Sequence, residues 1–181
     1  MKYDIVKMVG DEHVRYSLTN KGDNPLIVIG INPSTADKNK PDPTLRRVMG
    51  FAERYGFDSF VMLNVYPLRA SNPATLPQEC KAELHTANIR EIVNVVSSHP
   101  GASILLAYGG NINSRKYLRP CLRDIVDAIK PYSPKYVQIG TALNLDGSPK
   151  HPLMAPYSST MTPCDINKQI NILAHTHELY S

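Results

Sequence analysis

A short apolar run that ends abruptly in polar residues is the feature of this sequence that most constrains its fold. Leu26-Ile27-Val28-Ile29 is followed by Gly30-Ile31-Asn32-Pro33-Ser34-Thr35, and Asn24-Pro25 precedes it. β-branched and leucine residues bounded by such turn formers fit a strand buried on both faces, as in parallel sheets. Ligands of parallel α/β sheets bind at the carboxyl ends of the strands, so residues 30–35 form the first candidate site. The alternative is a turn that only ends a core strand.

Further apolar runs repeat this design later in the chain. They occupy residues 59–63, 103–108 and 135–140, and polar or glycine residues follow each of them. Helical spacing of apolar residues lies between the runs, over residues 43–56, 78–96 and 118–129, and again after Asp165. This alternation predicts an α/β fold, a three-layer α/β/α sandwich around a central, mainly parallel four-stranded sheet. Residues 1–22 are predicted as N-terminal strands of an edge or flap, within a single domain over residues 1–181.

Composition limits the partners and the chemistry. The chain has 20 Lys and Arg against 16 Asp and Glu, a mildly basic balance that permits an anionic partner without requiring one. No apolar run approaches a membrane span, and the first residues lack the apolar core of a signal peptide, so we expect a cytoplasmic protein without a membrane partner. The 3 cysteines form no ligand spacing, so neither a disulfide framework nor a metal site nor a cofactor is predicted. The oligomeric state is left open.

The loops that follow the predicted strands carry a recognisable order of motifs. In chain order they are Gly30-Ile31-Asn32-Pro33-Ser34, Leu63-Asn64-Val65, Ala107-Tyr108-Gly109 and His151-Pro152-Leu153. This order resembles the uracil-DNA glycosylase superfamily, whose first loop reads GQDPYH or GINPG, whose second strand ends in a base-recognising Asn, and whose later loops carry W-G and H-P-S-P-L. The chain also resembles small bacterial and phage proteins known only as a domain of unknown function, with N-P-S-T-A-D and H-P-L signatures. The resemblance spans residues 26–156.

The resemblance implies roles for the loop residues. The predicted catalytic residues are Asn32, which would hold a water against the sugar carbon, and His151, which would donate a hydrogen bond to the departing base. Asn64 would pair with the edge of the base, and Tyr66 is the substitute for the ring that stacks on it. The predicted substrate-binding residues are Gly30, Ile31, Pro33, Ser34, Asn64, Tyr66, Tyr108, Gly109 and Leu153. Leu153 or Met154 is available to fill the vacated base stack.

Basic residues supply candidates for phosphate contacts. Arg115, Lys116 and Arg119 lie in the densest positive segment, and Arg46 and Arg47 lie outside the apolar stripe of an earlier helix. The predicted contacts to a nucleic-acid backbone are Thr35, Arg46, Arg47, Arg115, Lys116 and Arg119. The alternative for the arginines and the lysine is a plain solvated helix face.

Two departures from the resembled family bear on activity. Asn32 stands where the most active branch has an Asp that orients water, and an amide is not an effective general base. Leu153 stands where the late loop usually has a small Ser. Asn64 has the alternative role of capping a turn, and His151 that of a surface or capping residue.

These observations leave more than one class of function open. One is a nucleobase-recognising protein that acts as a slow or specialised N-glycosylase, a hydrolase of the N-glycosidic bond in nucleic acid. The alternative is a non-catalytic or differently catalytic binder of a free nucleobase, nucleoside or nucleotide, and a scaffold or interaction protein is a third class. The expected partner is therefore nucleic acid or a small molecule that contains a nucleobase.

Overall fold

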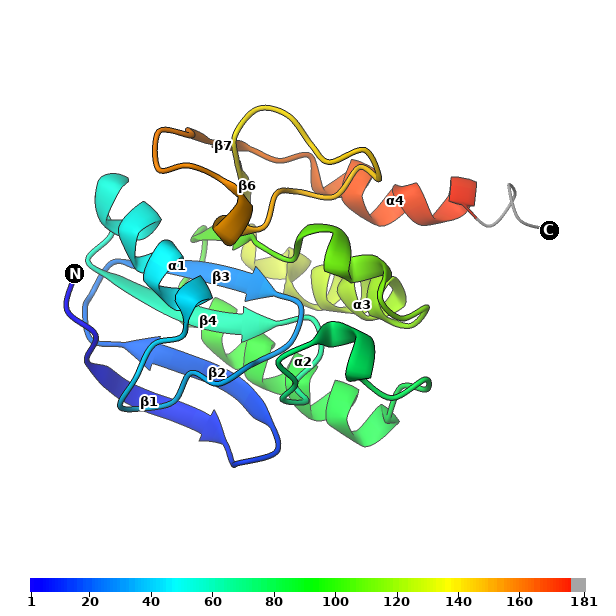
Figure 1. Ribbon diagram of the computed structural model, residues 1–181, viewed down its shortest axis with the longest axis horizontal. Helices are drawn as coiled ribbons and strands as arrows, with labels where there is room; N and C mark the ends of the chain where they lie inside the picture. Colours follow the sequence, from blue (N-terminus) through cyan, green and yellow to red (C-terminus); the bar gives the residue numbers. More distant parts are fainter. Residues whose placement is uncertain (177–181) are drawn as a thin grey trace.

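The computed structural model describes residues 1–176, with side chains up to Ile172, and residues 177–181 of the predicted domain lie outside the described residues. The fold is α/β, with a mixed sheet and four helices (Figure 1). The strands are β1 (Ile5–Gly10), β2 (Arg15–Asn20), β3 (Pro25–Gly30), β4 (Ser59–Asn64), β5 (Ser103–Leu106), β6 (Lys135–Ile139) and β7 (Met161–Pro163). The helices are α1 (Pro43–Arg54), α2 (Ala82–Ser97), α3 (Leu118–Ile129) and α4 (Ile166–Thr176), and a short 3-10 turn, η4 (Pro152–Met154), follows His151. No helix in this described part is long and apolar enough to cross a membrane.

The sheet is larger than the sequence predicts. It has seven strands in the order β1-β2-β4-β3-β5-β6-β7, so the prediction of a four-stranded sheet is wrong. The predicted apolar strands are β3, β4, β5 and β6, and neighbours among them pair in parallel. The other pairings, β1 with β2, β2 with β4 and β6 with β7, are antiparallel, which makes the sheet mixed. β7 is short and ends in Pro163 at the sheet edge, where a missing N–H is tolerated, so its sequence carried little strand signal.

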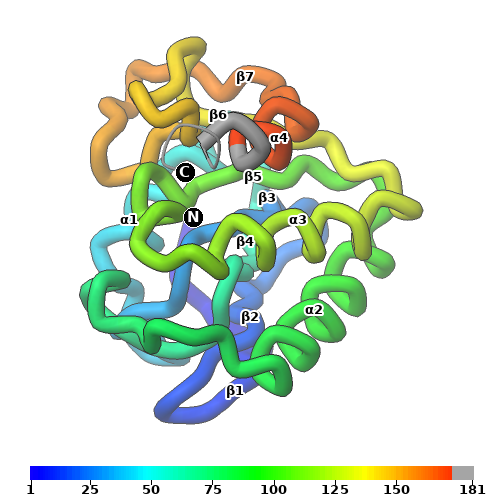
Figure 2. The backbone as a smooth tube through the Cα atoms, turned by 90° about the vertical axis from the view of Figure 1, so that its right-hand side faces the viewer, coloured from blue at the N-terminus to red at the C-terminus, as the bar shows by residue number. Residues whose placement is uncertain are grey.

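Helices pack on both faces of the sheet. Figure 2 shows α1 on one side and α2 and α3 on the other. Leu45, Val48 and Phe51 of α1 join one buried cluster, and residues of α2 and α3 such as Ile92 and Ile125 join the second. The chain passes from β3 through α1 to β4, and then crosses β3 through α2 to reach β5. The strand order therefore reverses at β3, and in open α/β sheets such a reversal opens a crevice at the carboxyl ends of the strands.

Helix α1 begins at Asp42-Pro43, a capping residue followed by the proline of the first turn, and contacts a distant loop. The Asp42 carboxylate accepts a hydrogen bond from the backbone N–H of Leu45 at 2.8 Å, and Pro43 occupies the first turn. The guanidinium of Arg47 lies 3.7 Å from the centre of the Tyr157 ring and donates to the carbonyl oxygens of Pro152 and Ala155. Helix α1 thus positions the segment that carries His151.

Gly50 of α1 leaves the space in which the Tyr157 ring lies. A Cβ atom at Gly50 would come within 2.4 Å of the Tyr157 hydroxyl oxygen and within 2.5 Å of its Cε1. Because this contact involves the ring, and Arg47 and Arg54 lie at 3.7 and 3.9 Å from the ring centre, Tyr157 has little freedom to move aside.

Gly50→Ala therefore tests the packing of α1 against this segment. Helix propensity alone would make the substitution stabilising by about 1 kcal/mol. We expect instead a net destabilisation of up to about 2 kcal/mol, because the Tyr157 ring cannot move aside and the overpacking penalty is about 1–3 kcal/mol. Chemical denaturation measures it, and Gly50→Ala in a Tyr157→Ala background is the control, where the same substitution should become stabilising. Stabilisation by Gly50→Ala in the wild-type background would contradict this packing.

Candidate functional site

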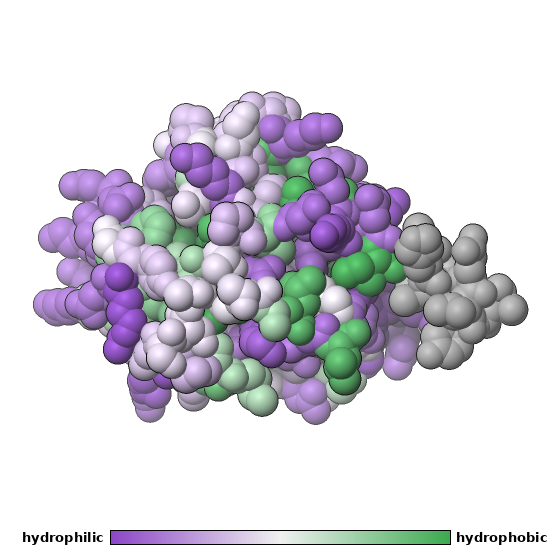
Figure 3. Space-filling model, turned by 90° about the horizontal axis from the view of Figure 1, so that it is seen from above, coloured by the Kyte–Doolittle hydropathy of each residue, from purple (hydrophilic) through white to green (hydrophobic). Residues whose placement is uncertain are grey.

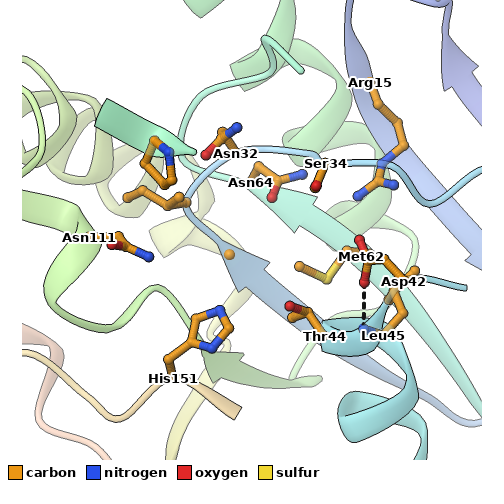
Figure 4. Close-up of a pocket in the computed structure, with 13 residues that line it drawn as sticks. Arg15, Asn32, Ser34, Asp42, Thr44, Leu45, Met62, Asn64, Asn111 and His151 are labelled. Atoms are coloured by element: carbon orange, nitrogen blue, oxygen red, sulfur yellow. Dashed lines mark hydrogen bonds between the residues drawn. The ribbon is translucent and has the colours of Figure 1, made fainter. Parts of the chain in front are cut away.

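A small cavity opens at the carboxyl ends of β3 and β4, where the strand order reverses (Figure 4). Its volume is about 80 Å³, and it is lined by Arg15, Gly30, Ile31, Asn32, Ser34, Asp42, Thr44, Leu45, Met62, Asn64, Pro73, Asn111 and His151. Residues far apart in the sequence meet here. Of Asn32, Asn64, Tyr108 and His151, which were expected to converge at one edge of the sheet, all but Tyr108 line the cavity. In the described residues, no group of three or more His, Cys, Asp or Glu side chains is arranged to hold a metal ion.

Asn64, the last residue of β4, presents an unpaired amide to this cavity. Its side chain is fully buried, and neither its amide nitrogen nor its amide oxygen has a hydrogen-bond partner. A buried polar group without a partner costs about 1–3 kcal/mol of stability. The amide therefore does not cap a turn, which was the structural alternative, and it remains available to a ligand.

The neighbours of Asn64 leave no room for a further side chain beside its amide and fix its backbone. Gly30 lies beside Asn64 in the parallel register, and a Cβ atom there would lie 3.0 Å from Asn64 Oδ1 and 2.7 Å from Met62 Cε. A side chain at position 30 would therefore crowd the amide. Asn88 of α2, buried, donates from Nδ2 to the carbonyl oxygens of Asn64 at 2.9 Å and Val65 at 3.2 Å.

Asn32 acts first as an anchor of its own loop. Its Nδ2 donates to three carbonyl oxygens, those of Pro33 at 3.0 Å, Leu68 at 3.3 Å and Ala70 at 2.8 Å. These bonds occupy the amide nitrogen, so only the amide oxygen is left for a water or a ligand. The predicted water-holding role of Asn32 therefore depends on that oxygen alone.

His151 presents a defined donor to the cavity. Its Nδ1 accepts a hydrogen bond from the backbone N–H of Leu153 at 3.2 Å, so the neutral ring carries its proton on Nε2. Burial lowers the pKa of His151 below its ordinary value, and the Asp42 carboxylate partly opposes this shift. The ring is therefore neutral at pH 7. Gly109, with φ of +58°, packs against it, and a Cβ atom there would lie 2.9 Å from His151 Cβ.

The cavity also contains charged residues that the sequence analysis missed. Arg15, at the start of β2, is only 2% exposed and lines the cavity together with Asp42 and Thr44. Figure 4 shows its guanidinium reaching toward Ser34 and Asp42. Residues 1–22 were predicted as strands of an edge or flap, where burial of a charge is not expected. In the structure β2 lies between β1 and β4, so its first residue is covered.

The predicted aromatic contacts do not reach the cavity. The Tyr66 hydroxyl accepts a hydrogen bond from the backbone N–H of Lys81 at 3.1 Å, and the Tyr66 ring packs on Tyr117. The Tyr108 hydroxyl donates to Gln169 Oε1 at 2.9 Å. Both rings belong to the buried cluster on the α2 and α3 face, whereas Met62, which lines the cavity, belongs to the cluster on the other face. No aromatic side chain lines the cavity in the part of the chain that the structure describes.

The remaining predicted substrate-binding residues lie around the cavity. Pro33 is buried in the first loop and lies outside the cavity lining. Leu153 and Met154 follow His151 on η4 and are exposed, by 48% and 79%. Figure 3 shows hydrophobic residues gathered on a largely hydrophilic surface of the molecule.

The predicted phosphate contacts divide into two groups. Arg115 donates to the carbonyl oxygens of Leu76 at 2.8 Å and Pro77 at 3.1 Å, Arg119 donates to Asn113 Oδ1 at 2.7 Å, and Arg47 is bound to η4 as described above. These arginines are thus used within the fold. The exposed group consists of Thr35, Arg46 and Lys116.

Comparison with known proteins identifies a family. A family model described as "Protein of unknown function (DUF1643)" matches residues 15–153, and the chain therefore belongs to this family. No curated protein and no solved structure matches the chain. The match includes β2 and every residue that lines the cavity. Nothing in these comparisons links the chain to the uracil-DNA glycosylases, so that resemblance rests on the loop motifs.

Burial of His151 predicts a pH dependence of stability. A histidine whose pKa is lowered by folding binds a proton more readily in the unfolded chain, so stability falls as the pH drops through the ordinary value of 6.5. His151→Asn keeps a hydrogen-bond acceptor for the N–H of Leu153, and we expect its stability to fall less than that of the wild type as the pH drops. Urea denaturation between pH 8 and about pH 5 measures it, with the exposed His13→Asn as the control. Parallel stability curves for wild type and His151→Asn would contradict the assignment.

Proposed function

We propose that this member of the DUF1643 family recognises a nucleobase, or a ring with the same hydrogen-bonding edge, through the amide of Asn64. The observation that carries the proposal is that this amide is fully buried, lines a cavity and has no partner on either polar atom. An unsatisfied buried amide at the end of a central strand is explained by a ligand that supplies the missing hydrogen bonds.

The chemistry of the amide defines the ligand edge that it fits. Asn64 Oδ1 accepts a hydrogen bond and Nδ2 donates one, in the same plane, which matches the adjacent donor and acceptor on pyrimidine and purine edges. Neutral His151 adds a further donor, Nε2–H, in the same cavity. Gly30, beside Asn64 in the parallel register, adds no side chain of its own between the cavity and the amide.

The resemblance to uracil-DNA glycosylases supports a catalytic version of this proposal. In that version the protein has the three-layer fold of the resembled family. Asn64 pairs with the edge of the base, and His151 donates a hydrogen bond to the departing base. Cleavage of an N-glycosidic bond places negative charge on the departing base, and one preorganised donor lowers such a barrier by about 3–4 kcal/mol. Asn32, bound to carbonyl oxygens and unable to act as a base, leaves water activation weak, which fits a slow or specialised enzyme.

A specific observation favours a nucleic-acid substrate for that version. Leu153 and Met154 are exposed immediately after His151. Apolar side chains in such places can enter a base stack when a nucleotide is extruded. The alternative remains a binder of a free nucleobase, nucleoside or nucleotide, for which this exposure has no purpose.

Substitution of Asn64 tests base recognition directly. Asn64→Asp cannot donate, so ligands that need the Nδ2 donor should lose binding by about 1–3 kcal/mol, roughly tenfold or more. Asn64→Ala should weaken binding of every cognate base. Isothermal titration with a nucleobase and nucleoside panel measures this, and melting curves report the fraction folded. The matched control is Asn39→Asp, an exposed Asn outside the cavity.

A purely structural Asn64 predicts a different outcome. Both substitutions would then change the melting temperature and leave the affinity per folded molecule unchanged. Unchanged affinity in Asn64→Asp and Asn64→Ala, with cognate ligands bound by the wild type, would end the proposal.

The catalytic version has its own test. Oligonucleotides with modified bases, in single and double strands, are incubated with the protein and base release is measured. We expect slow release of at least one base, reduced about 10²- to 10³-fold in His151→Asn. Base binding through Asn64 without release from any substrate would favour the non-catalytic alternative.

A further inference from the structure

Arg15 is a buried cation whose hydrogen-bonding groups are largely unused. Its side chain is 2% exposed and lines the cavity. Nη1 donates to the carbonyl oxygen of Ala36 at 3.0 Å, while Nε is buried without a partner. A guanidinium has five N–H donors, so a single carbonyl contact leaves most of its capacity unmet.

No carboxylate neutralises this charge. Within residues 1–172 no Asp or Glu oxygen forms an ion pair with Arg15. Asp42 is close enough to raise the pKa of Arg15, but burial and the nearby Arg69 lower it, to about 10 overall. Arg69 is itself bound to the carbonyl oxygens of Ser34 and Ala36. A buried charge without a partner is strongly unfavourable, and the usual compensation is an opposite charge.

We infer that Arg15 binds an oxyanion carried by the ligand, so that the ligand is an anionic small molecule of the nucleoside monophosphate class. This inference rests on base recognition by Asn64 and on the alternative form of the proposed function, a binder of a free nucleotide, because Asn64 and Arg15 line the same cavity and would contact one ligand. The hydroxyl groups of Ser34 and Thr44, which also line the cavity, are further donors to such a group. Arginine pairs with phosphate or carboxylate through two parallel N–H bonds, and these charge-assisted bonds are the strong ones.

The burial of Arg15 separates a small ligand from a polymer backbone. Side chains that contact nucleic-acid phosphates lie on a basic exposed surface. Here Arg47, Arg115 and Arg119 are bonded inside the fold, and the exposed Arg46 and Lys116 do not line the cavity, whereas Arg15 does. Arg15 is therefore the cation placed to meet an anionic group on a ligand that enters the cavity.

The experiment compares ligands that differ by the anion alone. The intact protein is titrated with each nucleobase, its nucleoside, its nucleoside 5′-monophosphate, inorganic phosphate and a short oligonucleotide. For the cognate base we expect the monophosphate to bind about tenfold or more tightly than the nucleoside. Arg15→Met should abolish this advantage, so that the variant binds the monophosphate and the nucleoside with similar affinity, and Arg15→Lys should retain part of it. Arg46→Met, an exposed arginine of α1, is the matched control.

Folding of the variants is checked by melting. Arg15→Met removes an unpaired buried charge and keeps the aliphatic stem, so we expect its melting temperature to equal or exceed that of the wild type. Arg15→Lys keeps the charge and provides a second measure of the anion contact if Arg15→Met folds poorly.

The outcomes distinguish failure of the inference from failure of the proposed function. Nucleoside binding that depends on Asn64 with no gain from the phosphate, or a gain that survives in Arg15→Met, overturns the inference and leaves the proposed function standing. Binding of the oligonucleotide alone also overturns it. Inorganic phosphate bound through Arg15, with no nucleobase ligand bound at all, would support the oxyanion site and overturn base recognition.

Discussion

The cavity depends on a set of hydrogen bonds that hold the loop after β3 against the loop after β4. Asn32 donates to the carbonyl oxygens of Leu68 and Ala70, and the backbone N–H of Ala70 donates to the carbonyl oxygen of Pro33 at 2.9 Å. Arg69 adds bonds to the carbonyl oxygens of Ser34 and Ala36. A loop buried at a strand end needs partners for its carbonyl groups, and side-chain amides and guanidinium groups supply them here. The result is a rigid rim around Asn64.

Of the seven buried side-chain nitrogen and oxygen atoms without a partner in the described residues, three belong to Asn64 and Arg15, which line one cavity. Asn88 pairs with the backbone of Asn64 and Val65, yet the Asn64 amide and Arg15 Nε lack partners. Asn64 and Arg15 lie on different strands and line the same cavity, so a local distortion of one segment does not explain both unpaired groups. Proteins retain such stability losses mainly at functional sites, where a ligand recovers them.

The fold was predictable where burial dominates the sequence pattern. The apolar runs identified β3, β4, β5 and β6, and Asp42-Pro43 identified the start of α1. Residues 1–22 were predicted as strands of an edge or flap, and they form β1 and β2. The full width of the sheet was not predictable, because β7 is a short edge strand whose residues are only partly buried and lack a continuous apolar signal. Membership of these strands in one sheet follows from pairings between distant parts of the chain.

The sequence by itself determined which polar residues follow each core strand, and this was enough to bring Asn32, Asn64 and His151 to one cavity, because parallel strands end at the same sheet edge. Only the tertiary structure decided which side chains face that cavity. Tyr108 packs in the cluster on the α2 and α3 face, away from the cavity. Arg115 donates to a backbone carbonyl oxygen inside the fold. Arg15 entered the site from β2, which pairs with β4 across a long stretch of sequence. Which donors remain free depends on the hydrogen bonds that the neighbouring carbonyl groups accept, and these bonds form only in the folded chain.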